Sequence, residues 1–382
     1  MSDRPLRVLT YLNSFNPGGV ERVALRLIGA WRQDGVEAVL VMGSDKGAAR
    51  GALGDTPYRL LHDNGHWLQR ALALRILFQL PAIIRQERPD ILFCAGNTYS
   101  WVALLMRLMM GRRCPPVVAK ISNDLVRHDQ RPLVRFGYHL WLRLQGQVID
   151  HFVGMAPPMA DEIMRYTGAG QGRVTIINDP ALLIAEVDRL AETGSKRVLA
   201  ENGRRFLAIG RLSPQKNLAV MLAAFARMAG RADRLTIVGE GPERPALEKQ
   251  AAMLGIADQV AMPGYSDNLH PWLQSAETLV MSSDYEGVPA AIIEAIAANL
   301  TVVATDCSVS MAALTGNGQF GTLVPVGDVE ALARAMSMAT YDACRASAAR
   351  AHAAEFTLES GSAQYLALMR RLAAERQALN LR

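Results

Sequence analysis

The 382-residue sequence lacks several features that define whole classes of protein. No uninterrupted apolar run reaches the roughly 18 residues that a membrane-spanning helix needs, so we expect no spanning segment. Residues 1–5 carry no apolar signal-peptide core, and the four cysteines are scattered without metal or redox spacing. The seven histidines form no ligand cluster. These absences predict a cytoplasmic protein with reduced thiols and no metal site.

Two short motifs are missing as well. Residues 16–20 do not supply the Gly-x-Gly-x-x-Gly that a dinucleotide-dependent dehydrogenase carries after its first strand. No Asp-x-Asp occurs anywhere, and this is the pair that would hold a divalent ion against a diphosphate. The sequence therefore disfavours a dehydrogenase, and it predicts that no metal or other cofactor is needed.

What the sequence does contain is an alternation of short β-branched runs with longer helical patterns, which is typical of βαβ units and parallel sheets. The expected strands are 8–12, 38–42, 91–95, 117–121, 151–155 and 174–177 in the first half, and 206–209, 235–238, 260–262, 278–281, 301–305 and 322–324 in the second. Two such series predict an α/β protein of two doubly wound, Rossmann-like domains facing a central cleft.

The break between the two series is expected near Asp179-Pro180, because the residue before a proline favours an extended or turn backbone. A polar stretch, 192–205, follows it without an apolar period. We therefore expect domains over 1–180 and 181–357. The tail, 358–382, begins with a helical pattern.

A corner at the end of one expected strand carries two glutamates eight residues apart, Glu286 and Glu294. Pro289 favours a helix start between them, and the free N–H groups of a helix start attract anions such as phosphate. Carboxylates that can hold hydroxyls around a bound phosphate suit a sugar nucleotide. The alternative is a solvated Glu286 and a Glu294 on an ordinary helix face.

Two cations bracket a turn after another expected strand. Arg211 can bind a diphosphate as a fork and Lys216 as a point charge, although both could be ordinary surface cations. The paired glycines Gly18 and Gly19 follow the first expected strand, where missing side chains let backbone N–H groups approach a diphosphate. A plain strand–helix turn would explain these glycines too.

Gly210-Arg211-Leu212 with Lys216-Asn217, then residues 238–242 and the two spaced glutamates, resemble the donor half of retaining, family 4-type (group 1) glycosyltransferases of GT-B fold. Residues 18–21 are similar to the glycine loop near the start of such enzymes. The resemblance implies a metal-independent hexosyltransferase that moves a sugar from a nucleoside diphosphate sugar to a glycan or lipid-linked acceptor, as in bacterial exopolysaccharide, capsule or lipopolysaccharide synthesis. It also suggests that the tail helix crosses back to the first domain.

For the site residues, we expect Arg211 and Lys216 to bind the diphosphate with help from Gly18 and Gly19. Glu286 would hold sugar hydroxyls and Glu294 the ribose. The remaining phosphate contacts would come from backbone N–H groups in the segment Gly287, Val288, Pro289 and Ala290. Rival interpretations are a GT-B sugar-nucleotide epimerase or hydrolase, and a non-catalytic sugar-nucleotide-binding subunit.

The acceptor side departs from the family pattern. Many relatives carry a histidine after the strand that corresponds to 117–121, whereas this chain has Ser122-Asn123-Asp124. Asn123 could hydrogen-bond a sugar hydroxyl or carbonyl instead. Asp124 could act as a base or cap the following turn.

The positive charge is concentrated between Trp101 and Gln145, which holds eight Lys or Arg against two Asp and many large apolar residues. This mixture suits a protein that is peripheral at the inner face of the cell membrane, on an anionic membrane surface. The alternative is a helix pair whose arginines face water. We find no nucleic-acid recognition motif and expect no nucleic-acid partner.

Overall fold

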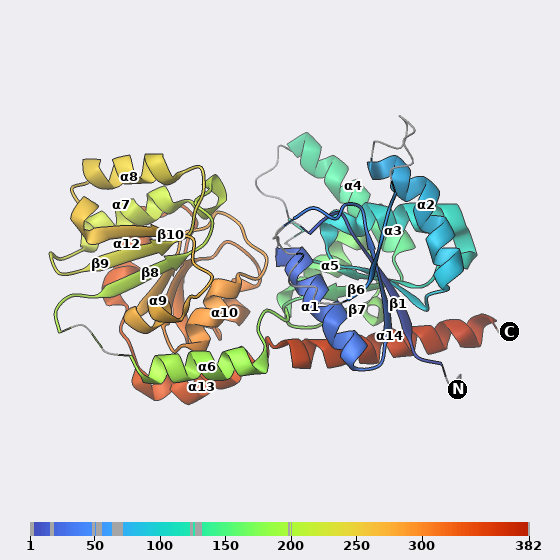
Figure 1. Cartoon of the computed structure of the whole chain (residues 1–382). Helices are drawn as coiled ribbons and strands as arrows, with labels where there is room; N and C mark the ends of the chain where they lie inside the picture. Colours follow the sequence, from blue (N-terminus) through green and yellow to red (C-terminus); the bar gives the residue numbers. More distant parts are fainter. Residues whose placement is uncertain are drawn as a thin grey trace. The chain divides into compact units, whose positions relative to one another are not determined.

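The computed structural model describes residues 4–15, 19–47, 50, 56–62, 72–122, 125–126, 132–197, 199 and 201–380. The chain divides into two compact units (Figure 1). The first unit comprises residues 1–180 and 358–382, and the second comprises residues 181–357.

The first unit is built on a seven-stranded, fully parallel sheet with the order β3-β2-β1-β4-β5-β6-β7. Its strands are β1 Arg7–Leu12, β2 Glu37–Met42, β3 Tyr58–Leu60, β4 Ile91–Cys94, β5 Val117–Lys120, β6 His151–Gly154 and β7 Val174–Ile176. β4, β5 and β6 are buried along their whole length, as expected of strands with helices on both faces.

Within the described residues, the longer helices beside this sheet are α1 Gly19–Gln33, α2 Leu72–Glu87, α3 Ser100–Met110, α4 Pro132–Val148, α5 Pro158–Thr167 and α14 Leu358–Asn380. α14 comes from the end of the chain and packs on α1 and β4. Trp31, Phe93 and Tyr365 meet edge to face where these three elements join, and all three side chains are buried. This aromatic cluster ties the tail helix to the first unit.

The second unit has a six-stranded parallel sheet with the order β10-β9-β8-β11-β12-β13. The strands are β8 Arg205–Ile209, β9 Arg234–Val238, β10 Val260–Gly264, β11 Thr278–Met281, β12 Thr301–Thr305 and β13 Gly321–Val324. The helices are α6 Ile184–Ser195, α7 Leu218–Met228, α8 Arg244–Met253, α9 His270–Ser275, α10 Ala290–Ala297, α11 Met311–Leu314, α12 Val329–Met338 and α13 Ala346–Ala354.

Two separate apolar clusters form the core of this unit. Phe206, Val280 and Val303 pack with α7 and α12, whereas their chain neighbours Leu207 and Leu279 pack with α6, α10 and α13. Successive side chains of a strand point to opposite faces, so each strand contributes to both clusters. The arrangement fixes the strands in register and sets where their carboxyl ends lie.

The predicted α/β class with two doubly wound sheets is confirmed, and all twelve expected strands are present within one or two residues at each end. Three details differ. The short edge strand Tyr58–Leu60 was not expected. The last residues of α6, 192–195, fall within the stretch 192–205 that was predicted to lack an apolar period. Pro289 precedes α10 as its N-cap residue, where the prediction had it as the first helical residue.

Candidate functional site

The candidate site lies where the strand order of the second sheet reverses. β8 and β11 are neighbours in this sheet, although β9, β10 and the helices α7, α8 and α9 lie between them in the chain. Ligands of open parallel sheets bind at such a switch point. The two strands pair only through Phe206 with Thr278 and Leu207 with Leu279. Beyond these pairs the strand ends diverge, which opens space between Ile209 and the end of β11.

Hydrogen bonds join the two loops that follow these strands. The Lys216 ammonium donates to Oε1 of Glu286 over 2.6 Å. Nε2 of Gln215 donates to the Tyr285 carbonyl over 2.8 Å, and the backbone N–H of Asp284 donates to the Gln215 carbonyl over 2.9 Å. The structure thus brings two of the predicted catalytic residues, 70 positions apart in the chain, into direct contact.

The turn that presents Lys216 has identifiable local causes. Pro214–Lys216 forms a single 3-10 turn, and Asn217 follows in the left-handed conformation with φ 44° before α7 begins. Asparagine tolerates this conformation better than most residues. The Ser282 hydroxyl lies within hydrogen-bonding distance of the carbonyls of Lys216 and Asn217, at 2.9 and 3.0 Å. The residue directly after β11 therefore holds the turn that presents Lys216.

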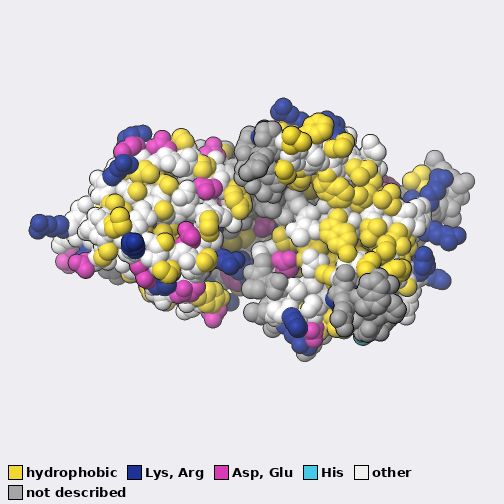
Figure 2. Space-filling model, turned by 90° about the horizontal axis from the view of Figure 1, so that it is seen from above, with side chains coloured by type: hydrophobic (Ala, Val, Ile, Leu, Met, Phe, Trp, Pro, Cys, Tyr) yellow, Lys and Arg dark blue, Asp and Glu magenta, His cyan; other side chains and the backbone are white. Residues whose placement is uncertain are grey.

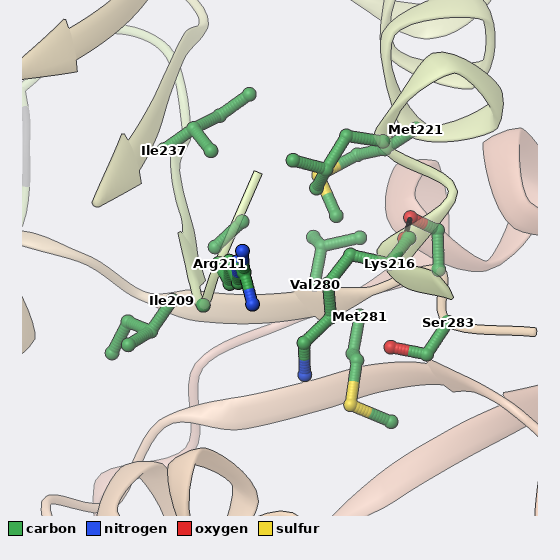
Figure 3. A pocket seen from close by; sticks show the side chains of 12 residues that line it. Ile209, Arg211, Lys216, Met221, Ile237, Val280, Met281 and Ser283 are labelled. Carbon is green, nitrogen blue, oxygen red and sulfur yellow. Dashed lines mark hydrogen bonds between the residues drawn. The ribbon is translucent and has the colours of Figure 1, made fainter. Parts of the chain in front are cut away.

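A narrow pocket lies between the diverging strand ends (Figure 3). Arg211 and Lys216 line it, and the Lys216 side chain lies over Gly210, where an added Cβ would come within 2.9 Å of its Cε. Arg211 is exposed, and no carboxylate among the described residues pairs with it. Ser283 is fully buried beside the pocket, and its hydroxyl has no hydrogen-bond partner within the described chain.

The pocket is therefore lined by two cationic side chains and by one hydroxyl group that has no hydrogen-bond partner among the described residues. A guanidinium and an ammonium on one loop suit an anionic group such as a diphosphate. The described residues contain no group of three or more His, Cys, Asp or Glu side chains that could hold a metal ion.

The segment from Gly287 to Ala290 leads from Glu286 into α10. The Gly287 carbonyl accepts a hydrogen bond of 3.1 Å from the Ser308 hydroxyl, and Pro289 is buried. The first N–H groups of a helix have no intrahelical partner, so Ala290 and its neighbours offer donors at this helix start. Glu294 follows one turn later on α10 and is half-buried. The structure therefore places Glu286, residues 287–290 and Glu294 along the loop after β11 and the start of α10, whereas Arg211 and Lys216 lie on the loop after β8.

Glycines of the neighbouring loops are required by close packing. Gly239 has φ +153°, and an added Cβ would lie 1.9 Å from the Gly210 carbonyl oxygen. The Gly210 N–H donates to the Val238 carbonyl and the Gly239 N–H to the Gly264 carbonyl, at 3.0 and 2.9 Å. These contacts hold the loops after β8, β9 and β10 together. The glycines are needed here because a side chain would prevent the backbones of the loops from packing so closely.

The predicted site residues of the first unit are only partly covered by the described chain. Gly19 is the first residue of α1 after β1, and an added Cβ there would meet no atom within 4 Å. Gly18, Asn123 and Asp124 lie outside the described residues. Their roles stay predictions.

Sequence reasoning missed the residues that organise the carboxyl edge of the first sheet. Oδ1 of Asn97 accepts from the Ser122 N–H over 2.8 Å, and the Tyr99 hydroxyl donates to Glu21 over 2.6 Å. Burial, reinforced by Glu21, raises the pKa of Tyr99 above its ordinary range. Partners this far apart in the chain leave no local spacing signal, so a single sequence does not reveal them.

A buried carboxylate stands just beyond this edge. Oε1 of Glu162 accepts from the N–H groups of Leu125 and Val126, at 2.9 Å each. Burial raises the pKa of Glu162, and the two backbone hydrogen bonds lower it in part. Together with the Asn97 contact, this carboxylate fixes the described chain on both sides of residues 123–124.

Two family models match the chain. The model of Glycosyltransferase Family 4 matches residues 17–180, and the model of Glycosyl transferases group 1 matches residues 203–342. Each match falls within one structural unit, and together they span most of the chain. With the fold and the site above, the chain belongs to the glycosyltransferases of GT-B fold, as the resemblance predicted.

Two relatives of the chain are named as glycosyltransferases. The chain is 24% identical over 342 residues to the lipopolysaccharide core biosynthesis glycosyltransferase LpsE of Rhizobium meliloti, covering 87% of this chain and 89% of LpsE. It is 30% identical over 241 residues to a D-inositol 3-phosphate glycosyltransferase of Streptosporangium roseum, covering 58% of this chain and 53% of that enzyme. The second relative is thus matched over about half of its length.

Solved structures share the fold. The crystal structure of Anabaena HepE in complex with UDP superimposes with a TM-score of 0.75 at 17% identity, covering 96% of this chain and all of HepE. HepE is also known with UDP and glucose and with UDP-glucose. At this identity the likeness shows the fold.

Proposed function

We propose that this glycosyltransferase is a retaining, metal-independent enzyme that takes its sugar from a nucleoside diphosphate sugar. The acceptor is a glycan or lipid-linked glycan in bacterial exopolysaccharide, capsule or lipopolysaccharide synthesis. LpsE, a relative named in lipopolysaccharide core biosynthesis, supports this setting, and the UDP complexes of HepE support the donor class. The observation that carries the proposal is the contact between Lys216 and Glu286 at the sheet's switch point.

Each donor residue has a chemical role in the proposal. Arg211 and Lys216 neutralise the diphosphate, and the N–H groups of Gly287 to Ala290 add hydrogen bonds to it. Glu286 binds hydroxyls of the transferred sugar, and Glu294 binds the ribose. On the first unit, the Gly18–Gly19 backbone assists the diphosphate and Asn123 contacts the sugar.

The chemical step follows from these roles. The acceptor hydroxyl attacks the anomeric carbon on the face from which the phosphate leaves, so the new glycosidic C–O bond keeps the configuration of the old one. The bond from the anomeric carbon to the phosphate oxygen breaks, and the hydroxyl proton passes to that oxygen. The protein contributes positioning and stabilisation of the charge that develops on the diphosphate. Retention rests on the family resemblance, and the absence of Asp-x-Asp supports metal independence.

A donor screen tests the proposal. Ligands that bind only the native state raise the unfolding temperature by mass action, so the set of nucleoside diphosphate sugars can be ranked by thermal shift. The best donor is then incubated with glycan acceptors, and the anomeric configuration of the product is read by NMR. Release of free sugar regardless of acceptor would indicate a hydrolase. Conversion of the donor to an isomer would indicate an epimerase, and no turnover with tight binding would indicate a binding subunit.

A further inference from the structure

Helix α4 turns apolar side chains toward solvent. Leu133, Phe136, Leu140 and Leu144 are all exposed, Leu133 at 88% and Phe136 at 72%. Their spacing of three or four residues places them on one face of the helix. Polar side chains ordinarily occupy the solvent face of a surface helix, whereas the buried face of α4, which includes Leu142, packs on α3 and α5.

The apolar surface continues onto the two neighbouring helices. α3 packs between α2 and α4, and it exposes Leu108 and Met109 near its end. α2 exposes Phe78. Figure 2 shows the result as a broad group of hydrophobic side chains on one face of the first unit. Contiguous apolar surface of this kind marks an interaction site.

The charged side chains of α3, of the turn after it and of α4 are all basic. Residues 100–113 and 132–148 contain five arginines, Arg107, Arg112, Arg113, Arg135 and Arg143, and no Asp or Glu. Arg107 pairs with Asp150, while Arg112, Arg113 and Arg143 are exposed. On α2 the exposed Arg85 lies seven residues after Phe78 and so on the same helix face.

The arginines at the ends of α2 and α3 meet in a hollow of about 520 Å³, which α14 closes on one side. Six arginines line it: Arg4, Arg85, Arg88, Arg112, Arg113 and Arg376. The acid in its lining is Asp90, which pairs with Arg4. Like charges this close together repel one another, and bound anions would relieve that repulsion. The hollow therefore suits anionic groups.

The structure corrects the sequence-based choice of residues for this surface. Lys120 was counted in the basic segment, but it is buried and paired with Asp179. Among the aromatic residues of this segment, Trp101, Tyr138 and Trp141 are half-buried, whereas Phe136 is exposed. The surface is therefore made mainly by aliphatic side chains with arginines at its margin.

We propose that the face formed by α2, α3 and α4 binds an anionic lipid bilayer, with the apolar side chains among the acyl chains and the arginines on lipid phosphates. None of the helices within the described residues is long and apolar enough to cross a membrane, so the contact is one of helices lying on the surface. A second copy of the chain fits less well, because a twofold interface sets the same patch against itself and brings its arginines together without acids. The inference does not depend on the donor site.

Vesicle sedimentation of the full chain tests this inference. Phosphatidylcholine vesicles are compared with vesicles that also contain phosphatidylglycerol, at low and high salt. Phe136→Ser with Leu140→Ser removes apolar contacts, and Arg112→Glu with Arg113→Glu reverses charge. Met253→Ser with Met338→Ser is the matched control, since both methionines are 78% exposed on the second unit.

We expect binding to the anionic vesicles that weakens with salt. Each arginine lost lowers partitioning about fivefold, so the charge variant falls at least ~30-fold. The apolar variant falls more than ~10-fold and keeps its response to lipid charge. The control binds like the wild type, and all variants keep the wild-type unfolding temperature.

Three results would overturn the inference. The first is equal binding of the wild type to neutral and anionic vesicles. The second is wild-type binding by both variants. The third is the formation of concentration-dependent dimers, seen by sedimentation velocity, that Phe136→Ser with Leu140→Ser abolishes. The last of these would assign the face to a second copy of the chain.

Discussion

The contact between Lys216 and Glu286 leads to a prediction about substitutions of these two residues: one lowers turnover and the other weakens nucleotide binding. The two side chains are 20% and 12% exposed and 2.6 Å apart, so water screens the pair only partly. In the free enzyme each neutralises the other. A diphosphate that takes over Lys216 must replace the carboxylate as its partner.

Glu286→Gln therefore leaves affinity for a nucleoside diphosphate unchanged or improved, because the ammonium no longer has a competing carboxylate. The sugar loses a charged acceptor, so kcat and kcat/KM fall together by roughly two to three decades. Lys216→Ala, in contrast, weakens the binding of a nucleoside diphosphate. Losing a hydrogen bond to a charged group costs about 1.5–3 kcal/mol, which weakens nucleotide binding by ~10-fold to 150-fold.

Isothermal titration with UDP as the probe, and initial rates with the donor found by thermal shift, measure the two effects. The matched control is Glu192→Gln on α6, which breaks the exposed pair with Lys196 and leaves binding and rates unchanged. Wild-type rates in Glu286→Gln would remove that residue from the site. Equal loss of UDP binding in both site variants would mean that the pair acts only as a structural link between the loops.

Three further predictions address the metal, a buried histidine and a glycine. Turnover survives excess chelator, because Arg211 and Lys216 neutralise the diphosphate; a strict need for magnesium or manganese would contradict this. Burial, reinforced by Arg371 and Arg173, lowers the pKa of His151 from 6.5 to about 4. The unfolded state therefore binds a proton that the folded state does not, and stability falls from about pH 6.5 to about 4, by ~3 kcal/mol from this residue. Denaturant unfolding shows a shallower loss over that range in His151→Gln, and identical pH slopes would refute the assignment. Gly239→Ala destabilises the protein by about 3 kcal/mol or more, since its Cβ would meet the Gly210 carbonyl at 1.9 Å, while Gly230→Ala, with 3.8 Å to the nearest atom, is tolerated in the same unfolding assay.

The sequence predicted the sheets well because buried parallel strands have a strong local signature. Runs such as Thr301–Thr305 are rich in β-branched residues and buried along their whole length, and each is bounded by turn residues. Tyr58–Leu60 has only three residues at the sheet edge and one exposed side chain, so its pattern is too short to recognise. Strand order was not readable in the same way, since pairing such as that of β8 with β11 joins residues about 70 positions apart.

In the candidate site too, features with a local pattern could be predicted from the sequence, whereas contacts between distant residues could not. Glu286 and Lys216 could be predicted because each follows a recognisable strand and stands beside turn residues. Their direct contact could not, because it depends on which two strands lie at the switch point. Ser283 carried no signal at all, since a buried serine at a strand end is unremarkable until its hydroxyl is found without a partner.

The splayed ends of β8 and β11 explain why the pair of Lys216 and Glu286 lies where it does. The two strands stop pairing after Leu207 and Leu279, so no backbone ladder holds the loops beyond that point. Individual contacts link the loops instead: the ion pair, the hydrogen bond from the Gln215 side chain to the Tyr285 carbonyl, and the backbone hydrogen bond from Asp284 to Gln215. A ligand that competes for Lys216 therefore also competes for one of the links across the gap.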